Sequence, residues 1–312
     1  MLAEKNHTAP QIFDLVLSTD WEYDRDFIDL LEKQAKEQNL KTYVVWTGNL
    51  DSTYEGLREG RLKFRFLFDR ASDTTPEFYK IQDWMLQHQG QVFESLEELR
   101  WASDKATMHL EFIANGLLTP YTVILPPYDE IPGDVKIPVE EFTALGKPFI
   151  IKPANTTGGG RGVVDGASTI EEIYEARKNY PADKYLIQEK VKPLERDGYR
   201  FWFRGFFACG LIQVSWWNDL TRLYKDLTVE EVSRYGLEPL NTIIENIAGI
   251  CRLQFFSTEM ALLSDNRLVV VDYVNESSDM RLKSKAVDGV PDHVVRNNAK
   301  EIIKYIRRRL HA

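Results

Sequence analysis

A glycine-rich loop between two segments of strand character is the feature that most constrains this chain. The run Phe149–Pro153 is apolar up to Lys152 and ends at a proline, and extended sequence resumes at Val163 and Val164. The loop between them contains Gly158, Gly159, Gly160, Arg161 and Gly162. Consecutive glycine amides can approach phosphate oxygens closely and donate hydrogen bonds to them. Because a P-loop and a dinucleotide-binding turn both lead into a helix, the order strand, loop, strand predicts instead a flap that folds over phosphates.

Lys152 lies at the end of the strand that enters this loop. Three apolar residues precede it, so we expect its aliphatic stem to be enclosed. An enclosed ammonium group either reaches water or pairs with an anion, and beside a glycine flap the natural anion is phosphate. Protein kinases also fold a flap over phosphates, but their lysine follows the flap, and no HRD or DFG motif occurs downstream here. The position of Lys152 therefore predicts a phosphate contact.

Two acidic residues lie on the last two expected strands, 255–263 and 268–274. A two-residue turn formed by Asp265 and Asn266 would place Glu259 directly opposite Asp272. Facing carboxylates repel each other unless a cation neutralises them, and oxygen ligands suit Mg²⁺. Asn275 is a candidate to add an amide oxygen at the end of the strand. A longer turn would slip the register by one residue and direct Glu259 to the other face.

The first hundred residues alternate strand and helix patterns, which predicts a small parallel α/β sheet. The expected strands are 13–17, 42–46, 64–68 and 91–93, and the expected helices are 24–38 and 76–88. A second unit is expected to begin near Ser103, a candidate N-cap for a helix over 104–115. The expected domains are 1–102 and 103–312, and the second of these divides into 103–184 and 185–312.

Charge and cysteine content argue against several classes of function. Proteins that bind nucleic acid through many phosphate contacts usually carry a basic excess, whereas this chain has a formal net charge of −9. Two cysteines and five scattered histidines match no zinc or redox spacing, and so few cysteines favour a reducing, cytoplasmic setting. No signal-peptide pattern opens the sequence, and no apolar run approaches the ~20 residues of a membrane helix. We therefore expect a cytoplasmic protein without a nucleic-acid or membrane partner.

Taken in order, these parts resemble the ATP-grasp superfamily of carboxylate–amine ligases. The resemblance covers about residues 103–280. It is carried by the helix that begins Asp104-Lys105, the strand 149–153, the loop 158–163, the linker strand 186–191 and the terminal acidic strand. It implies an α/β chain in which an ATP-grasp fold, 103–312, follows a small Rossmann-like parallel α/β domain, 1–102. Within the ATP-grasp part, 103–184 would carry the lysines and the flap, and 185–312 the metal ligands.

The resemblance also implies a role for each candidate residue. Lys105 and Lys152 would contact the phosphates of ATP, with the glycine loop closed over them. The residues that would frame the adenine and the ribose are Gln188, Glu189, Val191 and Glu195. Glu259, Asp272 and Asn275 would hold Mg²⁺. Many family members end in Glu-x-Asn, and the wider spacing of Asp272 and Asn275 leaves Glu276 as an alternative last ligand.

The implied reaction is an ATP- and Mg²⁺-dependent ligation. A substrate carboxylate attacks the γ-phosphate to give an acyl phosphate, and an amine then displaces phosphate to form an amide. The protein supplies positioning and charge neutralisation. Lys152 would stabilise the transferring phosphoryl group, and Arg200 and Arg281 are candidates to hold the acyl phosphate or the substrate carboxylate. The expected partners are small-molecule or peptide carboxylates and amines, and self-association into a homo-oligomer is left open. A small-molecule kinase on the same scaffold and a non-catalytic nucleotide-binding protein remain alternatives.

Overall fold

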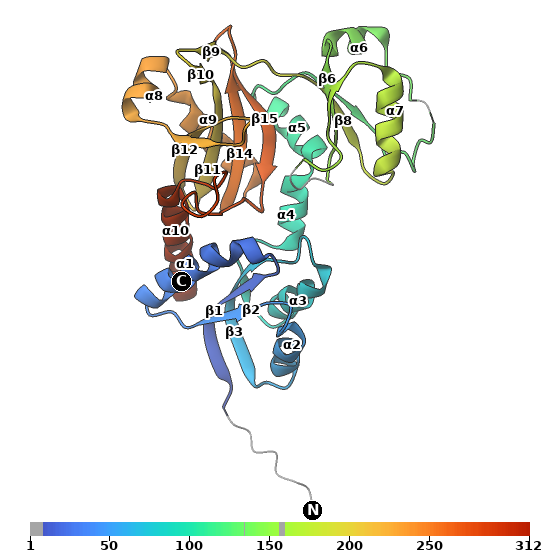
Figure 1. Ribbon diagram of the computed structural model, residues 1–312. Helices are drawn as coiled ribbons and strands as arrows, with labels where there is room; N and C mark the ends of the chain where they lie inside the picture. The colour runs from blue at the N-terminus through green and yellow to red at the C-terminus, as the bar shows by residue number, and fades with distance from the viewer. Residues whose placement is uncertain (1–8, 134, 156–159) are drawn as a thin grey trace, which may run out of the picture. The chain divides into compact units, whose positions relative to one another are not determined.

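The computed structural model describes residues 9–133, 135–155 and 160–312 (Figure 1). By internal contacts the chain divides into two compact units. The first unit runs up to Glu98 and also takes in Ala208–Leu211 and Asp279–Ala312, and the second unit comprises Leu99–Phe207 and Ile212–Ser278. Within the described ranges, no helix is both long enough and apolar enough to cross a bilayer.

The first unit is built on the small parallel sheet that the sequence predicted. Its strands are β1 (Gln11–Thr19), β2 (Thr42–Val45), β3 (Leu62–Arg70) and β4 (Gln91–Val92), in the order β2-β1-β3-β4 with parallel pairing throughout. Its helical elements are η1 (Glu22–Asp24), α1 (Arg25–Glu37), α2 (Leu50–Arg58), η2 (Pro76–Phe78), α3 (Tyr79–Gln87) and α10 (Asp292–His311). The helix α4 (Leu96–Ser103) leads the chain into the second unit.

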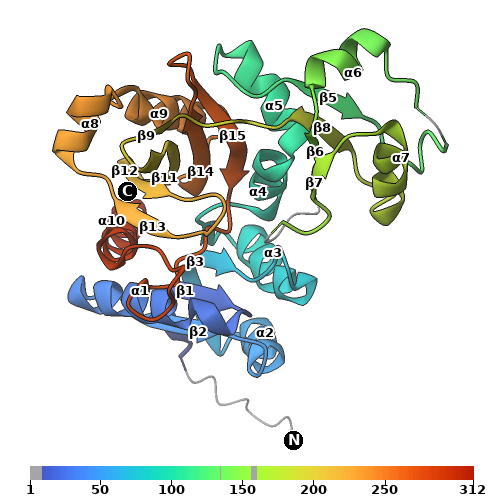
Figure 2. The same ribbon diagram turned by 45° about the horizontal axis from the view of Figure 1, so that its top comes forward.

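Helices cover both faces of this sheet. Val16, Leu67 and Ile81 belong to a buried cluster between the sheet and the helices α2 and α3, while α1 and α10 lie on the other side (Figure 2). The sequence analysis assigned α10 to the second domain, but it packs against α1 in the first unit. The physical reason is its apolar stripe, in which Val295, Ala299, Ile302 and Ile306 recur at helical spacing and are fully buried.

A buried ion pair ties the loop after β1 to the end of β3. The guanidinium of Arg70 donates two hydrogen bonds to the carboxylate of Asp24, at 2.6 and 2.9 Å. Only 6% of the Arg70 side chain and 2% of the Asp24 side chain are exposed. Each charge therefore depends on the other for its stability inside the protein.

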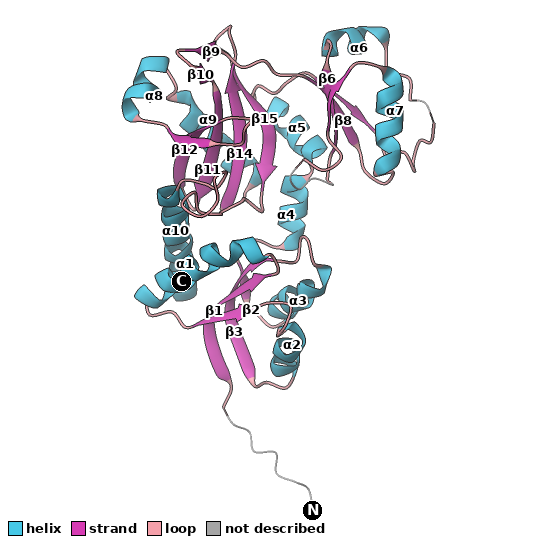
Figure 3. Cartoon of the chain, viewed as in Figure 1, coloured by secondary structure: helices cyan, strands magenta, loops and turns pink. Residues whose placement is uncertain are grey.

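Two antiparallel arrangements make up most of the second unit (Figure 3). The flap sheet consists of β5 (Thr122–Leu125), β8 (Tyr185–Glu189), β6 (Phe149–Pro153) and β7 (Val164–Ala167), in that order, with the helices α6 (Val139–Leu145) and α7 (Ile170–Asn179). The larger sheet has the order β13 (Tyr224–Asp226), β12 (Leu211–Trp217), β11 (Trp202–Ala208), β14 (Phe255–Leu262) and β15 (Leu268–Asn275). A short ribbon of β9 (Glu195–Arg196) and β10 (Tyr199–Arg200) precedes β11.

One face of the larger sheet is the hydrophobic core of the second unit. The helices α5 (Lys105–Ala114) and α9 (Pro239–Cys251) pack against it, and α8 (Val229–Tyr235) precedes α9. Phe112 and Ile244 from the helices meet Phe203, Met260 and Val270 from the strands in one buried cluster. Side chains alternate along a strand, so Trp202, Arg204 and Glu259 lie on the opposite face. This second face therefore carries charged side chains, in contrast to the apolar first face.

Breaking the buried ion pair of the first unit should be costly. The substitution Asp24→Asn removes the carboxylate that accepts both hydrogen bonds from the buried Arg70 guanidinium, and we expect it to lower the free energy of unfolding by about 3 kcal/mol. Urea denaturation followed by circular dichroism measures the loss. The control Glu59→Gln removes a pair with Arg61 in which both side chains are more than half exposed, and it should change little. Equal effects of the two substitutions would contradict the assignment.

Candidate active site

The hairpin that carries the two acidic residues does not have the expected two-residue turn. Leu262 pairs with Leu268, and the N–H of Leu263 donates to the carbonyl of Arg267 at 2.8 Å. Asn266 closes this longer turn with a left-handed φ of 65°, a conformation that asparagine tolerates better than most residues. The prediction of the turn was therefore wrong, and the register beside it differs by one residue from the expected one.

A bulge nevertheless brings the two carboxylates face to face. Met260 pairs with Val270, whereas the next pair along the hairpin is Glu259 with Asp272, so Val271 is an extra residue in β15. The inserted residue shifts the register by one and compensates for the longer turn. Glu259 and Asp272 thus face each other as predicted, although the turn between the two strands is longer than predicted.

A second bulge accommodates the wide spacing between Asp272 and Asn275. Asn275 pairs with Ser257, which lies on the same face as Glu259, so Asn275 shares the face of Asp272 despite the odd spacing. The amide of Asn275 is hydrogen-bonded to the Asp272 carboxylate and also donates to the carbonyl of Ser257 at 3.4 Å. The second bulge therefore keeps Asn275 on the same face as Asp272, although the spacing departs from the Glu-x-Asn pattern.

Two buried lysines adjoin the carboxylates. Lys152, at the end of β6, and Lys105, at the start of α5, are each only 7% exposed, so the predicted enclosure of Lys152 is confirmed. The ammonium of Lys152 donates to the carbonyl of the bulged residue Val271 at 3.2 Å. Burial lowers the pKa of Lys152 to about 8, against the opposing attraction of Asp272. Burial alone would raise the pKa of Asp272, but Lys105 and Lys152 hold it below its ordinary value.

Arg204, on β11, is a third cation of this cluster and was not foreseen from the sequence. Its guanidinium forms an ion pair with Glu259, in which the two side chains are 13% and 12% exposed. The indole N–H of Trp202 donates to the other oxygen of Glu259 at 3.2 Å. Burial and the nearby Asp272 raise the pKa of Glu259 to about 7, while Arg204 opposes the shift. The only sequence signal was the alternation that places Trp202 and Arg204 on one face of an aromatic strand.

The donor set on this face suits a hard divalent cation. Glu259 and Asp272 provide carboxylate oxygens and Asn275 provides an amide oxygen, which are ligands that Mg²⁺ accepts. A group of three or more His, Cys, Asp or Glu side chains able to hold a metal does not occur among the described residues. Among the described residues, a metal here would therefore depend on two carboxylates and one amide.

The hydroxyl of Tyr273 joins three elements behind the cluster. It contacts Nδ1 of His109 on α5 at 2.8 Å and accepts a hydrogen bond from the amide of Gln188 on β8 at 3.0 Å. The same amide donates to the hydroxyl of Thr122 on β5 at 2.9 Å. Burial, reinforced by the charge of Lys152, lowers the pKa of His109 to about 4, so this histidine is neutral at physiological pH. The network fixes β15 relative to α5 and β8.

Side chains at the end of β8 and just after it contact other parts of the second unit. Gln188 is buried, and its side-chain amide donates to the hydroxyls of Tyr273 and Thr122. The carboxylate of Glu189 accepts from the N–H of Tyr121 at 2.9 Å. Val191 packs against the small apolar cluster that includes Trp202.

Each of the two arginines proposed from the sequence forms ion pairs with two carboxylates. The guanidinium of Arg200 pairs with Asp219 at 2.5 Å and with Glu195 at 2.7 Å, and Glu195 is itself largely exposed. Arg281 belongs to the first unit, where it pairs with Asp279 and Asp288 at 2.7 and 3.0 Å.

Only the second half of the glycine loop belongs to the described residues, and Gly158 and Gly159 lie outside them. Gly162 has a φ of 72°, and a Cβ atom there would come within 2.5 Å of the ring of Tyr180, so this position requires glycine. Gly160 also has a positive φ, and Arg161 is exposed. The loop returns to the flap sheet through β7, which preserves the predicted order strand, loop, strand.

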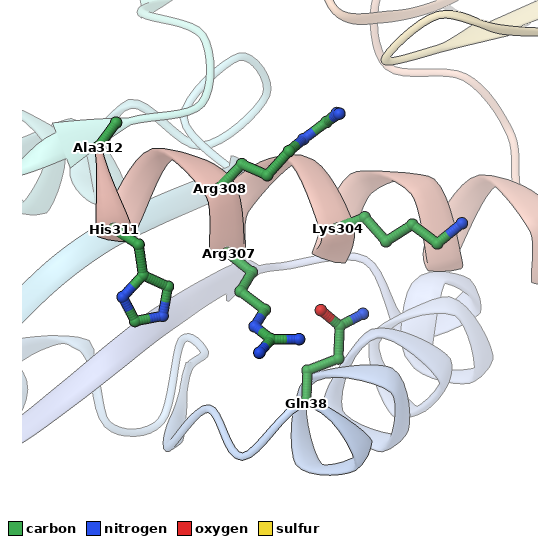
Figure 4. A pocket seen from close by; sticks show the side chains of 6 residues that line it. All are labelled: Gln38, Lys304, Arg307, Arg308, His311 and Ala312. Carbon is green, nitrogen blue, oxygen red and sulfur yellow. The ribbon is translucent and has the colours of Figure 1, made fainter.

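A basic hollow of about 460 Å³ occurs in the first unit, at the end of α10. Its lining residues are Gln38, Lys304, Arg307, Arg308, His311 and Ala312. Figure 4 shows Arg307 and His311 on the side of Gln38, whereas Arg308 extends on the opposite side of the helix. The cations do not converge on one point, and basic residues in a last helical turn complement the helix dipole.

Solved structures match the chain over nearly its whole length, whereas no family model and no curated protein matches its sequence. An ATP-grasp RimK domain protein from Sphaerobacter thermophilus has 17% identity and a TM-score of 0.62, covering 93% of this chain and 98% of the other. D-alanine–D-alanine ligase from Bacillus anthracis, complexed with ATP, has 12% identity and a TM-score of 0.65 over 95% and 97%. The ATP-grasp ligase PsnB, complexed with a precursor peptide and AMPPNP, has 12% identity and a TM-score of 0.62 over 96% and 99%. The chain has the ATP-grasp fold, as the resemblance predicted.

Removing the hydroxyl at the centre of the buried network should destabilise the second unit. Tyr273→Phe leaves His109 and Gln188 without their shared partner, and we expect a loss of about 2 kcal/mol in the free energy of unfolding. The control Tyr235→Phe removes a surface hydroxyl that donates to Asp197 and should cost clearly less. Urea denaturation of both variants provides the comparison, and equal midpoints would show that the Tyr273 hydroxyl does not join these elements.

Proposed function

We propose that this chain, which has the ATP-grasp fold, binds ATP with Mg²⁺ and joins a carboxylate to an amine through an acyl phosphate. The observation that carries the proposal is the cluster in which Lys105 and Lys152 adjoin the facing carboxylates Glu259 and Asp272. Buried lysines require anions, and facing carboxylates require cations. A magnesium–nucleotide complex supplies both, because its phosphates are anionic and its metal is cationic.

In this proposal the two lysines bind the phosphates of ATP. Both ammonium groups are nearly excluded from water, so their hydrogen bonds to phosphate oxygens act in a medium of low dielectric constant and are strong. The strand that ends at Lys152 leads into the glycine loop, so we assign the amides of that loop to the same phosphates. Glu259, Asp272 and Asn275 would hold Mg²⁺, which when bound neutralises phosphate charge and so favours attack on phosphorus.

The linker strand would frame the base through its backbone. The side chain of Gln188 is committed to Tyr273 and Thr122, so we assign it to the support of the site rather than to adenine. Glu189 and Val191 continue the linker and remain our candidates for contacts with the base. Glu195 is paired with Arg200 on an exposed ribbon, and its role toward the ribose is likewise a proposal.

The reaction then needs little covalent chemistry from the protein. A carboxylate oxygen of the substrate attacks the γ-phosphorus, the bond to the bridging oxygen breaks, and ADP leaves. The amine next attacks the acyl carbon, inorganic phosphate leaves, and the amide loses a proton. Lys105 and Lys152 hold the phosphoryl oxygens in line and stabilise their charge. The comparison proteins that are described as ligases, one of them bound to a peptide, support small molecules or peptides as substrates.

Nucleotide binding should depend on Lys152. Saturating ATP with Mg²⁺ should raise the melting temperature of the wild-type chain by mass action, and Lys152→Ala should abolish most of that rise. The control Lys178→Ala removes a half-exposed lysine of α7 that pairs with Glu175, and it should keep the full shift. An equal shift in all three proteins, measured by differential scanning fluorimetry, would reject the phosphate role of Lys152.

Catalysis should release phosphate only when an amine is present. The chain is incubated with ATP, Mg²⁺ and pools of amino acids, and hydroxylamine is added to trap the acyl phosphate as a hydroxamate. Asp272→Asn should lower turnover about a hundredfold or more, whereas Asp165→Asn, at a 60% exposed side chain, should not. A stable phosphorylated product that needs no amine would identify a kinase instead, and nucleotide binding without any turnover would identify a non-catalytic protein.

A further inference from the structure

Several contacts hold Arg204 at the carboxylate cluster. Its guanidinium forms the ion pair with Glu259, and Nε and Nη2 donate to the hydroxyl of Ser257 at 3.2 and 2.9 Å. The guanidinium also lies 5.7 Å from the ring centre of Trp217. These contacts place a planar cation on the charged face of the sheet, beside Asp272 as well as Glu259.

Arg204 and a divalent cation would use the same carboxylate. One oxygen of Glu259 accepts from Arg204 and the other from Trp202, yet Glu259 is also a proposed ligand of Mg²⁺. A guanidinium and a divalent cation on a single carboxylate repel each other strongly where water is excluded. Occupation of the metal site therefore weakens the bond between Arg204 and Glu259.

A guanidinium released from Glu259 would remain at the site. The hydroxyl of Ser257 and the ring of Trp217 do not depend on the metal, so they keep the guanidinium on the same face of the sheet. Its forked geometry matches a carboxylate or a phosphate through two parallel hydrogen bonds. Arg200 and Arg281, in contrast, are each paired with two carboxylates of their own.

We propose that Arg204 is the anion-binding residue of the ligation site. In the ligand-free chain it neutralises Glu259. When a divalent cation binds Glu259, Arg204 releases that carboxylate. It then binds the carboxylate of the substrate and, after phosphoryl transfer, the acyl phosphate formed from that carboxylate. The proposal rests on the function proposed above, and it assigns to Arg204 the role that sequence analysis gave to Arg200 and Arg281.

The first arm of the test measures metal binding without nucleotide. Mn²⁺ serves as the probe and its affinity is measured by electron paramagnetic resonance at pH 8. Arg204→Gln removes the competing cation and should tighten Mn²⁺ binding about tenfold, whereas Glu259→Gln should weaken it. Arg204→Lys keeps a positive charge and should stay near the wild type. The control Arg267→Gln lies at the exposed turn of the same hairpin and should change nothing.

The second arm measures anion binding with MgADP present. The probe is acetonylphosphonate, an unreactive analogue of acetyl phosphate in which a methylene replaces the bridging oxygen. Its affinity, measured by calorimetry, should fall about tenfold in Arg204→Gln. It should also fall in Arg204→Lys, because an ammonium cannot form the two parallel bonds. Arg267→Gln should bind the probe as the wild type does.

The two arms separate an anion-binding arginine from a structural ion pair. A purely structural role predicts tighter or unchanged Mn²⁺ binding in Arg204→Gln together with unchanged affinity for acetonylphosphonate, and this result would overturn the proposal. So would a wild-type chain that binds MgADP but not the phosphonate. Failure of the wild type to bind MgADP would instead refute the proposed function, and the manganese arm would still report on the competition at Glu259.

Discussion

The repulsion between two facing carboxylates is the constraint on which the second unit depends. Glu259 and Asp272 oppose each other across a hairpin in surroundings that largely exclude water. The cations that offset this repulsion come from three separate elements: Lys105 from α5, Lys152 from β6 and Arg204 from β11. The flap sheet, the larger sheet and the helix between them are therefore linked electrostatically as well as by their apolar core. The Tyr273 hydroxyl adds a neutral connection behind the same cluster.

The bulge at Val271 has two effects: it restores the pairing of Glu259 with Asp272, and it provides a hydrogen-bond acceptor for Lys152. An extra residue in one strand leaves a backbone carbonyl outside the regular ladder, and the ammonium of Lys152 takes that carbonyl as a partner. The same insertion returns Glu259 to the face of Asp272. Sequence alternation alone cannot reveal such a bulge, because it assigns faces only for an unbroken strand. The facing carboxylates were thus predicted correctly from an incorrect turn, since two one-residue deviations cancelled.

What the sequence could and could not predict follows from the range of the interactions. The parallel sheet and the enclosure of Lys152 depend on runs of neighbouring apolar residues, and both predictions were confirmed. The partner of Arg204 is 55 residues away and that of His109 is 164 residues away, and no local pattern encodes such pairs. The apolar stripe of α10 shows that the helix is buried on one side, but not that its partner is α1. Arg281 was proposed because it follows the acidic strand closely in the sequence, and in the structure it pairs with Asp279 and Asp288.

The charge balance of the cluster is better explained by a ligand than by stability. Buried ion pairs can often be replaced by packed apolar residues at no loss, or at a gain of about 1–4 kcal/mol. Three cations and two carboxylates on a sheet with an adequate core on its other face are therefore a poor device for stabilising the fold. Their excess of one positive charge suits an anion, and a site that must take both phosphate and a divalent cation needs groups of both signs. A buried cluster of cations and carboxylates is therefore the arrangement expected of such a site without its ligands.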